Sequence, residues 1–128
     1  MNAQSGTTPV ARISLAEKFA AIEDYWNPRI VGELNGQMVK LVKFIGAFVW
    51  HHHEKEDELF LVHRGSFRME FRDRAIELTP GDILIVPRGV EHRPVAEKEA
   101  EVLMFEPATT LNTGNVVNER TVWKPKNL

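Results

Sequence analysis

From Arg29 onward, short β-prone runs alternate with turn-forming residues, and this succession restricts the fold more than any other feature. Asn35-Gly36 is typical of a two-residue hairpin with a type I′ turn. Thr79-Pro80-Gly81-Asp82 predicts another turn, because Pro presets φ at one central position and Gly accepts a positive φ at the next. The predicted strands cover residues 29–34, 37–45, 47–53, 58–64, 66–72, 75–78, 83–86, 92–96 and 99–106. About eight to ten short strands favour a closed or nearly closed all-β architecture, since closure leaves few sheet edges exposed.

A short helix is expected before the first strand. Residues 1–13 show no periodicity and are interpreted as a loose arm. Ser14 and Glu17 match a capping box, and apolar residues follow at helical spacing. The pattern predicts a helix over about 14–23.

The chain after Pro107 is rich in Thr, Asn and Gly, and we expect it to return over the barrel as coil. Residues 121–123 are a possible last strand. The sequence thus predicts one domain in three parts: an N-terminal arm and short helix (1–28), a barrel (29–106) and a C-terminal extension packing on the barrel (107–128).

Composition excludes several classes of function. The chain has 128 residues, with 16 Lys and Arg against 18 Asp and Glu, and its formal charge of -2 gives no electrostatic case for binding nucleic acid or an anionic membrane. No apolar run approaches the ~20 residues of a membrane helix, so we expect a cytoplasmic protein. The absence of Cys leaves imidazole and carboxylate as metal ligands.

The histidine triplet His51-His52-His53 follows a β-prone run. On a helix the first and third imidazoles would point about 200° apart, whereas on a strand they share one face about 6.5–7 Å apart. The strand interpretation makes His51 and His53 partners and turns His52 to the opposite face. Glu58 opens the next predicted strand and supplies a carboxylate, and the distant His92 adds a third imidazole if its strand closes the barrel beside them.

These four residues predict one divalent metal ion: Zn, Fe, Mn, Ni, Co or Cu. A few residues near these four are candidates for other roles. Phe60, Arg88 and Arg93 are possible substrate contacts, although exposed charge on a turn is the commoner role of such arginines. Asp57 is a less favoured alternative to Glu58, and His63 is expected to face outward.

Two motifs in the chain resemble those of the cupin superfamily. The first reads Gly46-x4-His51-x-His53-x4-Glu58-x6-Gly65, and the second reads Gly81-x5-Pro87-x-Gly89-x2-His92. The interval from Gly46 to the first histidine is one residue shorter than the commonest form, and Ala96 stands where an Asn is often found. The chain is most similar to small single-domain cupins of the mannose-6-phosphate isomerase-like group.

The resemblance implies a cupin-type double-stranded β-helix, or jelly-roll barrel, whose metal ion is held by His51, His53, Glu58 and His92. It also implies frequent homodimerisation. The function expected is binding of a small polar metabolite in the barrel, with isomerase-like or dioxygenase-like catalysis. The alternatives are a non-catalytic module that binds a sugar or organic acid, and a purely structural metal site, which open coordination positions argue against. No catalytic residue is assigned.

Overall fold

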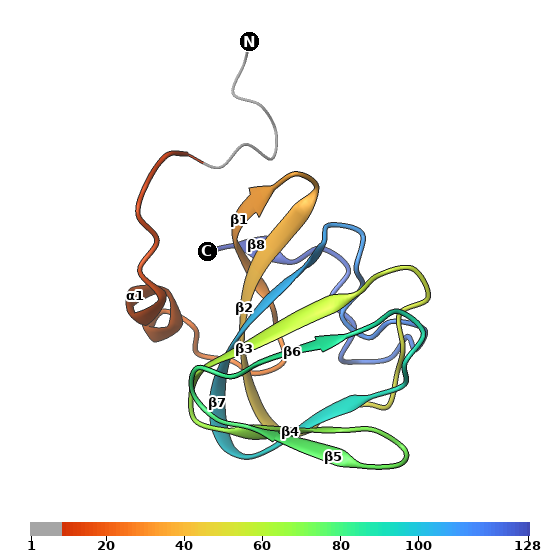
Figure 1. The fold of residues 1–128 in the computed structure, drawn as a ribbon. Coiled ribbons are helices and arrows are strands. Elements are labelled where there is room, and N and C mark those ends of the chain that lie inside the picture. Colours follow the sequence, from red (N-terminus) through yellow and green to blue (C-terminus); the bar gives the residue numbers. More distant parts are fainter. Residues whose placement is uncertain (1–8) are drawn as a thin grey trace.

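A computed structural model describes residues 9–128 and shows an antiparallel β-barrel with one short helix against its side (Figure 1). This confirms the predicted fold class. The elements are α1 (Leu15–Ala20), β1 (Arg29–Leu34), β2 (Gln37–Ala47), β3 (Glu58–Arg64), β4 (Phe67–Glu70), β5 (Ala75–Leu78), β6 (Ile83–Val86), β7 (Arg93–Pro107) and β8 (Lys126–Asn127).

Strand β7 joins the two sides of the barrel. It pairs with β2 along most of its length, while its other edge pairs first with β4 and then with β3. Each of the three strands that pair with β7 has a further neighbour: β5 pairs with β4, β6 with β3 and β1 with β2. Gly65 lies where β3 gives way to β4, and a Cβ there would stand 2.5 Å from the Glu99 carbonyl oxygen. Only glycine therefore fits at this position, where the chain between β3 and β4 passes close to the backbone of β7.

The core lies inside the barrel and follows the period-two alternation of the strands. Phe60 and Val62 of β3 point inward, as do Val102 and Met104 of β7. A second, smaller cluster lies outside β2, where Phe19 and Ile22 from the helical region cover Leu41. Helix α1 therefore stabilises one outer face of the barrel.

The hairpin and helix start agree with their predictions. Asn35 and Gly36 both have positive φ, as a type I′ turn requires. The Ser14 hydroxyl accepts a hydrogen bond from the Glu17 backbone N–H at 3.2 Å. The helix is shorter than predicted, because the chain leaves it at Ala21, where the Ala21 N–H donates to the Lys18 carbonyl and the Ile22 N–H to the Phe19 carbonyl.

Three predicted strands need correction. Residues 47–53 form no strand beyond Ala47, and the triplet keeps only an isolated bridge between His51 and His92. The runs 92–96 and 99–106 form one strand, β7, because the exposed charged residues between them bulge out of the pairing with β2 without forming a turn.

Residues 121–123 are not a strand, because a side chain and not a neighbouring strand pairs with their backbone. The Val122 N–H donates to the Asn112 amide oxygen at 2.8 Å. The last strand is β8, which pairs in parallel with β1. The first eight residues of the predicted arm lie outside the described residues. In the part of the chain that is described, no helix is long and apolar enough to cross a membrane.

Candidate metal centre

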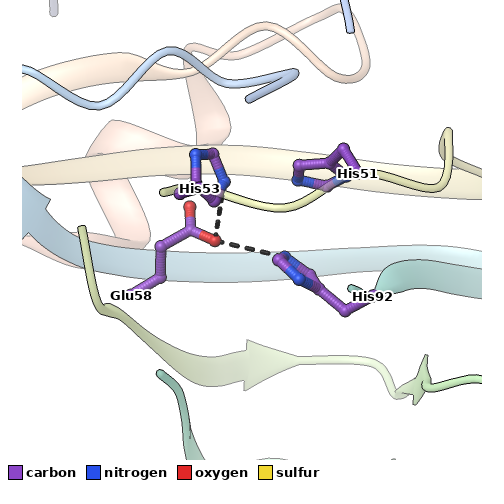
Figure 2. Close-up of side chains that lie close together, drawn as sticks. All are labelled: His51, His53, Glu58 and His92. Carbon is purple, nitrogen blue, oxygen red and sulfur yellow. Dashed lines mark ion pairs between the residues drawn. The ribbon is translucent and has the colours of Figure 1, made fainter. Parts of the chain in front are cut away.

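Four buried side chains converge at one end of the barrel interior: His51, His53, Glu58 and His92 (Figure 2). Each offers one ligand atom, and these atoms all lie within 4.8 Å of one another. His51 and His53 come from the segment after β2, Glu58 opens β3, and His92 immediately precedes β7. All four are at most 5% exposed.

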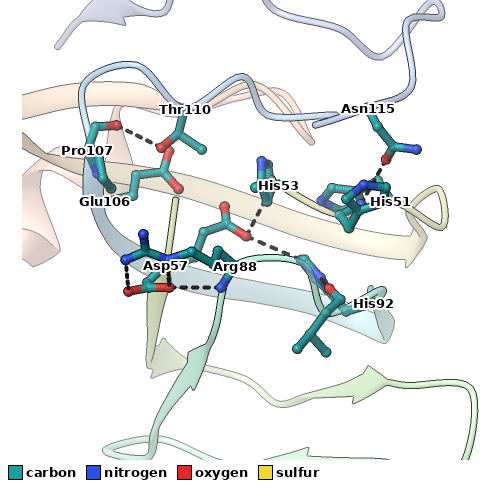
Figure 3. Close-up of polar contacts among 12 residues, drawn as sticks. His51, His53, Asp57, Arg88, His92, Glu106, Pro107, Thr110 and Asn115 are labelled. Atoms are coloured by element: carbon teal, nitrogen blue, oxygen red, sulfur yellow. Dashed lines mark hydrogen bonds and ion pairs between the residues drawn. The ribbon is translucent and has the colours of Figure 1, made fainter. Parts of the chain in front are cut away.

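Extended backbone places the triplet as alternation predicts, even though the segment is not a strand. The His51 N–H donates to the His92 carbonyl at 3.1 Å, and the His92 N–H donates back at 2.9 Å. His51 and His53 turn inward, whereas His52 faces outward and lies 3.7 Å from the Glu54 carboxylate. The His52 N–H donates to the Asn115 side chain at 2.8 Å, so the C-terminal segment holds the triplet from the other side (Figure 3).

Backbone carbonyls fix two of the imidazole rings. His51 Nδ1 donates to the Val49 carbonyl at 2.9 Å, and His92 Nδ1 donates to the Val90 carbonyl at 2.8 Å. With the proton on Nδ1, the Nε2 atom of each ring keeps its lone pair for a metal ion.

Unpartnered buried atoms show that the group fits a metal ion. His53 Nε2 and His92 Nε2 lie 3.0 and 3.2 Å from Glu58 Oε1. Within residues 9–128, none of these three atoms has a hydrogen bond of acceptable geometry. Buried polar atoms rarely lack a partner, and an ion among them would supply one. Three imidazole nitrogens and one carboxylate oxygen suit Zn, Fe, Mn, Ni, Co or Cu.

Electrostatics hold the ligands in the protonation states that a metal ion requires. Burial, with a further contribution from nearby His92, lowers the pKa of His51 to about 4, so the ring is neutral at neutral pH. Burial alone would raise the pKa of Glu58. Its contacts with His53 and His92 outweigh burial and hold the pKa well below its ordinary value, so the carboxylate stays charged. Neutral imidazole and ionised carboxylate are the binding forms.

A buried ion pair lies next to Glu58. Lys40 Nζ is 2.7 Å from Glu106 Oε2, and both side chains are only 2% exposed. Burial and the neighbouring Glu58 charge raise the pKa of Glu106 well above its usual range, despite Lys40. Sequence reasoning missed this pair. Alternation could have found it, because Lys40 shares the inward face of β2 with Val42, and Glu106 shares that of β7 with Met104.

A small cavity of about 30 Å³ adjoins two of the four side chains, His51 and Glu58. Phe60 forms part of its wall, and the Phe60 ring lies 6.4 Å from that of His92. The wall also includes Asn112 of the C-terminal segment.

The structure places the two predicted arginine contacts outside this cavity. Arg88 pairs with Asp57 on the surface, with Nη2 and Oδ2 3.2 Å apart. Arg93 pairs with Glu70 at 2.8 Å and lies over the Trp50 ring. Neither arginine lines the cavity, and their contact with a substrate stays a prediction.

Asp57 and His63 also lie apart from the four converging residues. Asp57 is held by Arg88, which lowers the pKa of its carboxyl. His63 stacks on Phe19, and its Nδ1 is 2.9 Å from Glu101 Oε1. The group of four therefore consists of the residues that the alternation argument selected.

Comparisons with known proteins place this site in context. The family model for the cupin domain matches residues 42–106, which carry all four side chains. A cupin-2 domain containing protein from Shewanella frigidimarina is 41% identical, with a TM-score of 0.73 over 74% of this chain and 93% of that chain. Protein NMB1881 from Neisseria meningitidis is 30% identical, with a TM-score of 0.71 over 77% of this chain and 100% of that one. YdbB of Bacillus subtilis is 34% identical over 87 residues, 59% of this chain and 77% of the relative. None of these names states a ligand or a reaction.

Proposed function

The chain belongs to the cupin family, and from this premise we propose that it holds one divalent metal ion through His51, His53, Glu58 and His92 and binds a small molecule at that ion. The observation that carries the proposal is the convergence of buried, unpartnered nitrogen and oxygen atoms from three separate segments. A buried cluster of this kind costs stability unless an ion satisfies it. Its position beside a cavity favours a functional ion over a structural one.

The protein's own residues supply orientation and exclusion of water. The carbonyls of Val49 and Val90 hold two imidazoles in place, and the buried Glu58 carboxylate supplies the one anionic ligand. Aromatic residues such as Phe60 surround the adjoining space. When bound, an ion in this site acts as a Lewis acid on a ligand oxygen, or as a redox centre if it is iron or copper.

The cavity wall bears on the type of reaction. Isomerisation needs a base close to the ligand, and the ionisable residues in the described wall are His51 and Glu58, both of which we assign to the metal. This favours dioxygenase-like chemistry, or ligand capture without turnover, over isomerase-like chemistry. The more specific similarity to mannose-6-phosphate isomerase-like cupins stays a prediction.

Metal content tests the proposal. Protein purified without metal-chelating resin should contain close to one equivalent of one transition metal. His51→Ala and His92→Ala should lose most of it, while His52→Ala, which changes an outward-facing neighbour, should retain it. Oxygen uptake with small acids, thiols and sugars would then separate redox chemistry from ligand capture. If His52→Ala lost as much metal as the other two variants, the assignment would be wrong.

Homodimerisation and a cytoplasmic location remain predictions. Ile83 and Ile85 on β6 are each 57% exposed on the outer face of the barrel, which is consistent with a contact between two copies. The mass of the protein in solution, measured by light scattering, would test the dimer.

A further inference from the structure

The cavity beside the proposed metal centre offers little to a polar or charged ligand. Its wall contains Glu58 and His51 at the metal end and Asn112 at the C-terminal segment, and the rest is apolar. The apolar part consists of Trp26, Pro28, Val42, Phe44, Phe48, Phe60, Pro94 and Met104. A ligand that occupies this cavity therefore meets polar groups at one end and mainly hydrocarbon elsewhere.

The other polar groups of the wall are already paired. Trp26 Nε1 donates to the Ile45 carbonyl at 2.9 Å. The Asn112 side chain uses both ends of its amide, because Nδ2 donates to the Arg120 carbonyl at 2.8 Å and Oδ1 accepts from the Val122 N–H at 2.8 Å. A ligand would have to break these bonds to obtain a hydrogen bond away from the metal, and the broken bonds would then have to be replaced.

No cation from the described residues enters the wall of this cavity. The buried Lys40 is held by Glu106 at 2.7 Å. Arg120 stacks on the Trp26 ring at 5.5 Å from its centroid but does not line the cavity. A phosphate group inside would lose its water without gaining a counter-charge, and this is strongly unfavourable.

The size of the cavity adds a second limit. About 30 Å³ is space for roughly two water molecules. A small apolar group such as a methyl fits this space beside a metal-bound head.

We propose that the ligand of this site has an oxygen-bearing head that reaches the metal and a small, uncharged, apolar remainder, and that molecules carrying a second anionic group such as a phosphate ester are excluded. This inference rests on the proposed function and names its substrate class. It excludes sugar phosphates and narrows the expected polar metabolite to one that is polar at its head only.

Three 2-hydroxy acids provide a matched test, because they share one metal-binding head and differ only at the third carbon. This carbon is a methyl group in lactate and a hydroxymethyl group in glycerate. In 3-phosphoglycerate the same hydroxymethyl group is esterified with phosphate. Each would be titrated into the cobalt(II)-loaded protein, with binding measured from the visible absorption of the metal and by calorimetry. Metal-free protein is the control.

We expect lactate to bind most tightly, glycerate less tightly, and 3-phosphoglycerate at least about tenfold more weakly than lactate. Equal or tighter binding of 3-phosphoglycerate would overturn the inference while leaving the proposed function intact. If cobalt bound and none of the three acids changed its spectrum, the inference would likewise fail. If cobalt itself did not bind, the proposed function would fail.

Two variants sharpen the test. Phe48→Leu widens the apolar wall, and it should improve binding of 2-hydroxy-3-methylbutyrate, which has a branched apolar remainder, relative to lactate. Arg120→Ala removes a cation that stacks on Trp26 of the wall and should leave the preference for lactate unchanged. Loss of 3-phosphoglycerate binding in Arg120→Ala would show that this arginine serves an anionic group and would contradict the inference. Circular dichroism would verify that both variants are folded.

Discussion

Two groups of ionisable residues, one inside the barrel and one on its surface, satisfy their charges in different ways. On the surface, Glu70 accepts hydrogen bonds from Arg68 and Arg93, each at 2.8 Å, and Arg93 also lies over Trp50. Inside, the nitrogens of His53 and His92 face Glu58 without a hydrogen bond of good geometry. A group whose charges are fully paired in contact with water needs no further explanation, whereas a buried group with unpaired atoms is suited to hold an ion.

Removing the interior carboxylate should have the largest effect. Glu58→Gln keeps the shape of the side chain and removes its charge, so affinity for the metal should fall by at least about 100-fold, since even outer partners of ligands are worth about 10–100-fold. Competition with a fluorescent chelator would measure the affinity. Glu101→Gln is the matched control, because Glu101 pairs with His63 away from the site. Equal losses in the two variants would place Glu58 outside the metal centre.

The buried ion pair should affect stability more than any surface pair. Lys40→Met leaves Glu106 buried without its cation, and we expect a loss of about 3–5 kcal/mol in the free energy of unfolding. The double variant Lys40→Met/Glu106→Leu should regain much of this loss, because it removes both charges from the interior. Urea unfolding measures both. A double variant less stable than Lys40→Met would contradict this explanation.

The metal-free protein should lose stability as the pH falls from about 6.5 to about 4. The pKa of His51 is about 4 in the folded chain against 6.5 for the free side chain, so the unfolded chain binds more protons in this range. This one group contributes about 3 kcal/mol over that range. Glu106, whose pKa is raised chiefly by burial, acts in the opposite direction. With a chelator present, the free energy of unfolding should therefore depend less steeply on pH in His51→Phe than in the natural protein. An unchanged pH dependence would show that His51 is not the group responsible.

The surface group should give the smallest effect. Glu70→Gln weakens two ion pairs that are in contact with water, and such pairs contribute little. We expect full metal content and a smaller change in unfolding midpoint than in Glu58→Gln, Lys40→Met or His51→Phe. Loss of metal in this variant would mean that the surface ion pairs of Glu70 affect the metal ligands inside the barrel. The two groups could then no longer be treated as independent.

Much of the barrel and the inward pair His51 and His53 followed from the sequence because both depend on local alternation, whereas the convergence of Glu58 and His92 on them also required closure of the barrel. His51 and His53 share a face in any extended backbone, so their placement survived although the segment is not a strand. Lys40 and Glu106 were missed because charged residues in strands are usually solvated, although alternation puts both on the inward face of their strands.

The path of the C-terminal segment depends on contacts between residues distant in the sequence. The Asn115 amide oxygen accepts from the His52 N–H, and a Cβ at Gly114 would collide with the His52 carbonyl oxygen. Neither contact has a periodic signal in the sequence. The same holds for Asn112, whose side chain bonds with the backbone of Arg120 and Val122 and whose place in the cavity wall was not predicted.

Anomalous X-ray diffraction from crystals of the protein, recorded at the absorption edge of the metal found in it, tests the central claim most directly. We predict one anomalous peak per chain, located among His51, His53, Glu58 and His92. A peak elsewhere, or a fully metal-loaded protein in which these four side chains point away from one another, would contradict the account.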